Sequence, residues 1–312
     1  MKKNPIHQKI MLQAFRQAGF KCRKVDKLST LYLIEKNKRK AFFNGTLRHD
    51  VSHLSYAIAK SKELSNDVFQ KFGLPVPKRK ICLSFNDALD FFKKHKPVVI
   101  KPDDRSLGVG VSVNISSQED LKTAYEKARK ASKCVAVEEF VRGRDYRLTV
   151  VNYQKVYAIE RVPAHIVGNG QNSVQELIDI KNGNKRGYQK DIKIDNESLK
   201  ILRQQELNLT FVPELGQIVY LRQAANVAQG GTTIDRTKEV SPYFKALAIA
   251  ACRAVKLPTA GVDVISPDIS GKRGKIIEIN SRPHIIIHLL PQIGRAYRVD
   301  KEVVKTFFSN KQ

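Results

Sequence analysis

The run Val98-Val-Ile-Lys-Pro-Asp-Asp-Arg-Ser-Leu-Gly-Val-Gly-Val111 is the most informative stretch in this chain of 312 residues. An apolar, β-branched strand leads directly into Lys101, and a polar, glycine-containing loop follows before a second strand begins at Val109. A lysine at the end of a buried strand supplies positive charge, and glycines let backbone N–H groups approach an anion closely. The stretch therefore indicates a phosphate-binding loop, although an ordinary hairpin with a glycine turn would have a similar sequence.

The composition is that of a globular chain with room for more than one lobe. Hydrophobic residues make up 42% of it, with 17 Gly and 12 Pro. No apolar run is long enough to span a bilayer, and the N-terminus lacks the apolar core of a secretion signal. The four cysteines show neither CxxC nor metal-finger spacing. We therefore expect a cytoplasmic protein without membrane association.

The net charge of +26 is unusual, because 56 basic residues face only 30 acidic ones. Residues 1–60 are the most basic part, with 14 Lys/Arg and three Asp/Glu. Such a field attracts anions, yet the chain has no helix-turn-helix, zinc-finger or aromatic-plus-basic RNA motif, so nucleic acid is not the expected partner. The charge indicates either a solvated basic surface or a site for an anionic substrate.

Helical and strand periodicities alternate irregularly along the chain, which predicts an α+β protein with several sheets rather than a repeated βαβ fold. The expected helices cover residues 5–20, 52–59, 63–72, 86–95, 116–131, 174–181 and 242–255, with another from residue 198. The expected strands are two within 30–43, then 79–83, 98–100, 109–114, 133–140, 146–151, 156–161, 218–221, 261–265 and 275–279.

Three oxygen-bearing side chains occur in two apolar strands near the C-terminus. Asp263 lies within Gly261-Val-Asp-Val-Ile265, while Glu278 and Asn280 share one face of the next strand because side chains alternate with period two. If the two strands pair, the three side chains meet and form the hard oxygen set that Mg²⁺ prefers. The alternative is that each acid simply faces solvent by alternation.

The segment from Val135 to Asp145 fits a nucleotide hinge. A strand ends in Glu138, Phe140 and Val141, turns at Gly143, and presents Asp145. Backbone groups beside an aromatic wall suit adenine, and a carboxylate suits ribose hydroxyls. Taken alone, the same segment could be an ordinary boundary between a strand and a turn.

Several ordered sequence runs resemble the ATP-grasp ligases over residues 61–312, and especially the ATP-grasp part of cyanophycin synthetase and of bifunctional glutamate–cysteine ligase/glutathione synthetase. The matching runs are 61–65, 73–77, 98–102, 137–147, 160–168, 221–232, 261–263 and 277–280. The resemblance implies an ATP-grasp fold, in which two α+β lobes hold ATP between them. It also implies a short basic region at 1–60, a small lobe at 61–137 and a large lobe at 138–312, with an insertion at about 165–225.

The resemblance also implies a role for each matched residue. For ATP it implies phosphate contacts from Lys62 and Lys101, a covering loop with Ser106 and Gly108, an adenine hinge of Glu138, Phe140 and Val141, and a ribose contact from Asp145. For the metal, Mg²⁺ or alternatively Mn²⁺, it implies Asp263, Glu278 and Asn280. Around the γ-phosphate and the acceptor acid it implies Arg147, Arg161 and Asn226, with the Gly230-Gly231 turn.

Two departures from the family concern the second substrate. Only a basic region of about sixty residues precedes the matched region, where the family has a longer domain, so part of the acceptor pocket would be missing or supplied by another subunit. After Asn280 the segment Ser281-Arg-Pro-His284 replaces the family's apolar run. Arg282 and His284 therefore become candidate substrate residues, because an arginine pairs with a carboxylate in bidentate fashion.

The sequence as a whole predicts an ATP-dependent carboxylate–amine ligase that works through an acylphosphate and releases ADP and phosphate. An acidic amino acid, a γ-glutamyl compound or a peptide is the expected anionic substrate. The alternatives are an enzyme that adds amino acids to an acidic peptide or polymer, and a non-catalytic protein that binds nucleotide or polyanion. A homo-oligomer is left open.

Overall fold

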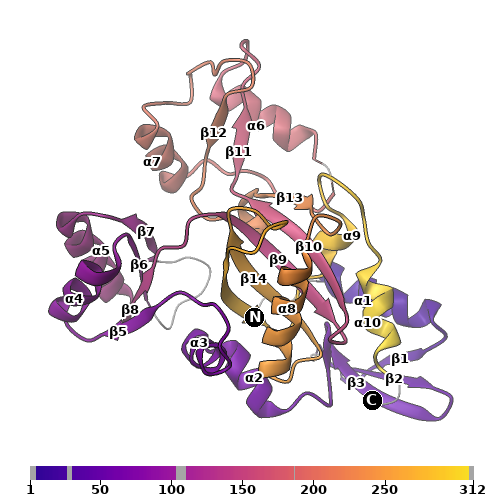
Figure 1. The fold of residues 1–312 in the computed structure, drawn as a ribbon. Helices are drawn as coiled ribbons and strands as arrows, with labels where there is room; N and C mark the ends of the chain where they lie inside the picture. The colour runs from indigo at the N-terminus through magenta and orange to yellow at the C-terminus, as the bar shows by residue number, and fades with distance from the viewer. Residues whose placement is uncertain (1–4, 27–29, 103–109, 186, 309–312) are drawn as a thin grey trace.

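The computed structural model describes residues 5–26, 30–102, 110–185 and 187–308, and these form a mixed α+β protein (Figure 1). The named strands build four antiparallel sheets with helices between them. This arrangement confirms the α+β class that the mixed order of elements predicted. Within the described ranges, no helix is long and apolar enough to cross a membrane.

A five-stranded sheet is the centre of the molecule. Its order is β13 (Thr232–Asp235), β10 (Lys155–Val162), β9 (Arg144–Val151), β14 (Thr259–Ser266) and β15 (Lys275–Asn280). Because side chains alternate along each strand, Leu148 and Val262 point toward the apolar helix α8 (Pro242–Ala254) and share its buried core. The alternate positions, including Arg147, Arg161 and Asp263, belong to the opposite face of the sheet.

A second lobe is built on a four-stranded sheet. Its order is β5 (Arg79–Cys82), β8 (Val135–Glu139), β6 (Val98–Pro102) and β7 (Ser112–Ile115), with α4 (Phe85–His95) and α5 (Gln118–Ala131) packed on it. Serine caps begin both helices, and Ser84 forms a full capping box with Asp87. This lobe stands to one side of the large sheet (Figure 1).

The insertion predicted at about 165–225 contains a small unit with a core of its own. A two-stranded sheet of β11 (His165–Val167) and β12 (Ile218–Tyr220) packs with α6 (Val174–Gly183) and α7 (Asn196–Gln204). Arg222 is buried beside this unit, and its guanidinium donates to Asp195 at 2.8 Å and to the Lys193 carbonyl at 2.9 Å. The short helix η1 (Val227–Gln229) then leads back into β13.

The basic N-terminal region is folded onto the end of the chain. Helix α1 (Pro5–Gln17) and the sheet β1 (Lys21–Lys24), β2 (Tyr32–Lys36), β3 (Arg39–Asn44) and β4 (Leu47–Arg48) share a core with α10 (Val299–Lys305). The sequence predicted only the β2–β3 hairpin of this sheet, and it missed α10. A short helix around Ile285–Ile287 was an alternative interpretation of His284 and His288, and the structure has the short helix α9 (Ile286–Leu289) there. Helices α2 (His53–Lys60) and α3 (Lys62–Lys71) pack against a different core, the one that the large sheet shares with α8.

The predicted domain bounds at 60/61 and 137/138 stay predictions. Strand β8 spans the second bound, since it continues to Glu139 while pairing with β5 and β6 of the smaller lobe. At the first bound, Ser61 is both the C-cap of α2 and the N-cap of α3, so one helix follows the other with no linker between them.

Leu148→Ala is expected to lower the free energy of unfolding by about 3 kcal/mol, because Leu148 is fully buried between the sheet and α8 and truncation leaves a cavity. Leu54→Ala is the matched control, since Leu54 is 69% exposed on α2 and should change stability by no more than about 0.5 kcal/mol. Urea unfolding of both variants measures the difference, and equal losses would contradict the placement of the core.

Candidate functional site

A buried carboxylate held by two arginines lies on the face of the large sheet opposite α8. Arg147 on β9 binds Asp263 on β14 through both Nε and Nη2, the second contact being 2.9 Å. Arg161 on β10 approaches the same Oδ2 at 3.1 Å. Burial by itself would raise the pKa of Asp263, but the two guanidinium groups outweigh burial and hold it below its usual value. Asp263 is therefore ionised, and its burial excludes the solvent-facing alternative.

Asp145 extends this cluster along β9. It accepts hydrogen bonds from Arg161 Nε at 2.8 Å and from Arg161 Nη2 at 2.5 Å. Burial raises the pKa of Asp145, and the nearby charge of Asp263 adds to that effect while Arg161 opposes it. The predicted ribose contact of Asp145 stays a prediction. In this structure the Asp145 carboxylate accepts hydrogen bonds from Arg161.

Glu278 and Asn280 join the cluster from β15. Asp263 and Glu278 are direct partners across the antiparallel pair, as the sequence predicted for a hairpin. With its amide oxygen toward Arg147, Asn280 accepts from Arg147 Nη2 at 3.3 Å and donates to Glu278 Oε1 at 3.1 Å. Gly261 is needed beside them, since a Cβ there would lie 2.9 Å from Arg147 Cδ and 3.2 Å from Pro283.

The oxygen set fits a hard cation that brings further ligands with it. Among the described residues no three or more His, Cys, Asp and Glu side chains form a metal cage by themselves. Asp263 already accepts three hydrogen bonds or ion pairs from arginines, one at Oδ1 and two at Oδ2, which leaves a position on Oδ1. Together with Glu278 and Asn280 this set suits Mg²⁺, which keeps water and phosphate oxygens in its shell.

Lys101 is the charged group that the smaller lobe contributes. It lies at the end of β6, is 9% exposed, and binds Glu138 on β8 at 2.5 Å. Glu138 also binds Arg79 at 3.0 Å, so the carboxylate that was predicted in the adenine hinge lies between two cations. Burial lowers the pKa of Lys101, Glu138 opposes this effect, and the nearby charge of Lys62 adds to it.

Phe140 and Val141 are half-buried just after β8, and the Phe140 amide donates to the Pro97 carbonyl at 3.0 Å. Their predicted place in an adenine hinge stays a prediction. Ser106 and Gly108, predicted in the covering loop, lie outside the described residues.

The two lobes meet at the junction of β8 and β15. Lys275, at the start of β15, binds Glu139 at 2.7 Å, and the Ile276 amide donates to the Pro75 carbonyl at 2.8 Å. Glu138, the residue before Glu139, holds Lys101, while Glu278 is three residues beyond Lys275. The junction therefore joins the strand that holds the partner of Lys101 to the start of the strand that carries Glu278 and Asn280.

A glycine turn lies next to Arg161. Asn226 caps η1 by accepting from the Ala228 amide at 2.9 Å, and its carbonyl accepts from the Gly231 amide at 3.1 Å. Gly230 has φ +89°, and a Cβ on Gly231 would lie 3.0 Å from the Val162 carbonyl oxygen. Both positions therefore need glycine, and the turn stays against β10. The predicted catalytic role of Asn226 stays a prediction, since the side chain here serves as a local cap.

Arg282 and His284 follow β15 and contact distant parts of the chain. Arg282 lies over the ring of Tyr56 on α2, 5.6 Å from its centroid, and donates to the Tyr56 hydroxyl at 3.0 Å. His284 lies between His7 of α1 and Tyr188 of the insertion, with ring centroids at 5.3 and 5.2 Å. Sequence reasoning did not single out His7 or Tyr188, because a lone histidine and a lone tyrosine carry no spacing signal.

The chain also resembles known proteins. It matches the family described as D-ala D-ala ligase C-terminus over residues 62–209. It is 35% identical over 280 residues to a cyanophycin synthetase from Nostoc sp., covering 86% of this chain and 31% of that protein. It is 30% identical over 272 residues to a glutathione biosynthesis bifunctional protein from Clostridium perfringens, covering 83% and 35%.

Among solved structures, a bifunctional glutathione synthetase from Pasteurella multocida superposes with a TM-score of 0.75 at 27% identity, covering 97% of this chain and 43% of that one. The chain thus spans about a third of the length of the curated relatives it matches.

Two buried histidines, His7 and His288, and the half-buried His284 should make the fold less stable in mild acid. Burial lowers the pKa of His7 and His284 to about 4 and that of His288 to about 3, from an ordinary value of 6.5. Below about pH 6.5 these histidines bind protons in the unfolded chain but stay neutral in the folded one. The stability of the fold with respect to these groups is therefore fully present above about pH 6.5 and is lost as the pH falls toward 4. We expect lower unfolding free energy at pH 5 than at pH 7.5.

His288→Gln tests the assignment. It removes one group that binds a proton in the unfolded chain but not in the folded one, so the free energy of unfolding should differ less between pH 5 and pH 7.5. His53→Gln, an exposed substitution on α2, should leave that difference as in the wild type. Urea unfolding at both pH values measures it. An unchanged pH dependence in His288→Gln would mean that His288 is not held neutral by the fold.

Proposed function

This chain belongs to the ATP-grasp ligase superfamily, and from that premise we propose that it is an ATP-dependent carboxylate–amine ligase. The observation that carries the proposal is the gathering of Arg147, Arg161, Asp263, Glu278 and Asn280 on one sheet face, at the junction with the lobe that holds Lys101. A site with several cations beside an incomplete set of oxygen ligands suits a triphosphate with its metal ion better than it suits a neutral ligand.

The proposed reaction has two steps. A substrate carboxylate oxygen attacks the γ-phosphorus of ATP, the bond to the β-phosphate oxygen breaks, and ADP leaves. An amine nitrogen then attacks the acyl carbon of the resulting acylphosphate, phosphate leaves with the bonding electrons, and the nitrogen loses a proton to water. The chain needs no nucleophilic side chain, because positioning and charge neutralisation supply the catalysis in phosphoryl transfer.

Each part of the cluster has a proposed share in this chemistry. Lys62 and Lys101 would bind phosphate oxygens, while Arg147 and Arg161 would bind the γ-phosphate and the acceptor acid. Asp263 fixes the two arginines, since it contacts both of them. Asp263, Glu278 and Asn280 would hold Mg²⁺, or Mn²⁺ with the same oxygens, and the metal when bound supplies further neutralisation of phosphate charge.

The adenosine would lie at the lobe junction, with Phe140, Val141 and the backbone after β8 against adenine. The amine-side substrate would enter past Arg282 and His284, which makes an anionic small molecule or peptide the expected partner. In this arrangement His7 supplies part of the acceptor wall from within the same chain. A non-catalytic nucleotide- or polyanion-binding protein is not favoured, because a binder has no need for the full oxygen set beside the arginines.

Glu278→Gln is expected to lower ATP-dependent ADP release by about a hundredfold or more, because a neutral amide neutralises a metal–phosphate centre far less well than a carboxylate. The side chain is half-buried, so the fold should be retained. ADP release is measured with pools of carboxylic acids and amines, with and without Mg²⁺. Glu119→Gln, an exposed change on α5, is the control, and normal Mg²⁺-dependent turnover by Glu278→Gln would refute the metal assignment.

Arg282→Ala is expected to raise the KM for the anionic substrate at least tenfold while leaving the KM for ATP nearly unchanged, because a lost ion pair removes binding rather than chemistry. Arg273→Ala removes the same charge from an exposed position in the β14–β15 turn and serves as the control. Steady-state kinetics at two salt concentrations separate a local contact from long-range attraction. Equal effects of the two substitutions would leave the basic charge as a surface property only.

A further inference from the structure

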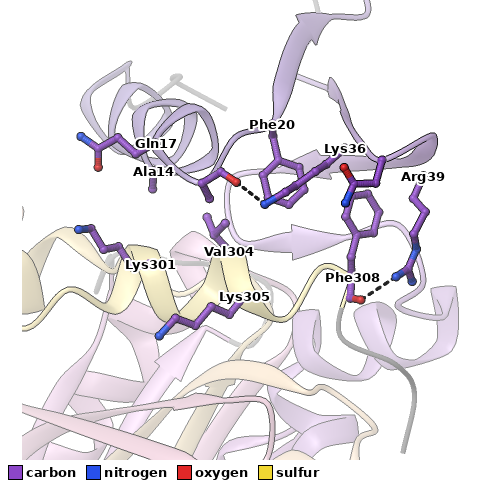
Figure 2. A pocket seen from close by; sticks show the side chains of 11 residues that line it. Ala14, Gln17, Phe20, Lys36, Arg39, Lys301, Val304, Lys305 and Phe308 are labelled. Carbon is purple, nitrogen blue, oxygen red and sulfur yellow. Dashed lines mark hydrogen bonds between the residues drawn. The ribbon is translucent and has the colours of Figure 1, made fainter.

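A cavity of about 560 Å³, which none of the residues of the candidate site lines, lies between α1, the N-terminal sheet and α10 (Figure 2). Its volume is in the range of sites that take small organic ligands. The lining residues come from three separate segments of the chain. They are Ala14, Gln17, Ala18, Phe20, Lys36, Asn37, Arg39, Lys301, Val304, Lys305 and Phe308.

One part of the lining is apolar and aromatic. Phe20 and Phe308 stack with ring centroids 5.3 Å apart and ring planes 22° from parallel. Ala14 on α1 and Val304 on α10 are buried beside them and belong to the same core. This part of the cavity would receive an aliphatic or aromatic group, because contact there removes apolar surface from water.

The other part of the lining is cationic. Lys36 is held in place, since its Nζ donates to the Ala18 carbonyl at 2.6 Å and lies 5.3 Å from the centroid of the Phe20 ring. Arg39 is held in the same way by the Phe308 carbonyl at 2.9 Å and the Phe308 ring at 5.0 Å. Two fixed cations therefore border the stacked rings (Figure 2).

Two lysines of α10 add to this charge. Lys305 binds Glu302 at 3.0 Å, but Glu302 does not line the cavity and also binds Lys155 at 2.6 Å. Lys301 makes no ion pair with any residue that the structure describes. Among the described residues, the lining contains four cations and no carboxylate, which leaves an excess of positive charge next to apolar surface.

We propose that this cavity binds a small organic anion in which an apolar chain or ring ends in a single carboxylate or phosphate. The apolar group lies against Phe20, Phe308 and Val304, and the anionic group lies among Lys301, Lys305 and the two fixed cations. An inorganic anion would leave the apolar part of the cavity in contact with water, and a neutral apolar molecule would bring no negative charge to offset the excess of positive charge. A cation is repelled.

The binding is tested by isothermal titration calorimetry on the full chain with octanoate, octyl phosphate, octan-1-ol and octylamine. We expect either or both of the two anions to bind at least tenfold more tightly than the alcohol and the amine, and the stronger of the two anions identifies the head group. Binding of octan-1-ol as tight as that of both anions would overturn the proposal, and so would no binding by either anion.

Paired charge reversals separate the cavity from the general +26 field. Lys301→Glu with Lys305→Glu should weaken anion binding at least tenfold, whereas Lys127→Glu with Lys130→Glu on α5 changes the net charge equally and should not weaken it. All four lysines are exposed, so the melting temperature should be retained in both double variants. Equal weakening by the two pairs would overturn the proposal.

Ala18→Phe offers a test of the apolar part that leaves every charge in place. A larger side chain at this lining position should reduce the affinity for octanoate and octyl phosphate, because it occupies space that the chain of the ligand needs. Unchanged affinity in a folded Ala18→Phe variant would mean that the apolar group does not enter the cavity.

Discussion

The ionised carboxylate of Asp263, buried between two arginines, is the interaction on which the arrangement of the candidate site depends. Three strands must stand in one register for Arg147, Arg161 and Asp263 to meet, since each residue comes from a different strand. Removing one partner of a buried charge pair costs about 3–5 kcal/mol, because the remaining charge stays desolvated. The register of β9, β10 and β14 is therefore tied to the charge pattern of the site.

The two faces of the large sheet have different chemical roles. On one face, apolar residues such as Leu148 and Val262 pack on α8 and supply much of the free energy that holds the sheet. The other face carries charges that cost free energy to bury and persist only because they are paired. A rigid apolar face allows the charged face to keep its geometry, which a loop could not do.

The basic N-terminal region is part of the same folded body rather than a tail. Helix α1 shares its core with α10 and β3 at one end, while at the other end His7 reaches His284. A single helix of 13 residues, about 20 Å long, therefore extends from the basic cavity to the segment that follows β15. Part of the positive charge of the first sixty residues, that of Lys36 and Arg39, thus lies at a folded site, the lining of this cavity.

The sequence by itself determined the α+β class, most helices and strands, and the closeness of Asp263, Glu278 and Asn280, because local periodicity fixes which side chains share a strand face and a short turn fixes the pairing. It did not reveal that Arg147 and Arg161 hold Asp263, that Glu138 lies between Lys101 and Arg79, or that His7 contacts His284. Those contacts join residues from 37 to 277 positions apart, and no local spacing records which distant strand or helix will be a neighbour. Only the tertiary structure decided them, because the burial of charges and rings depends on how whole elements pack.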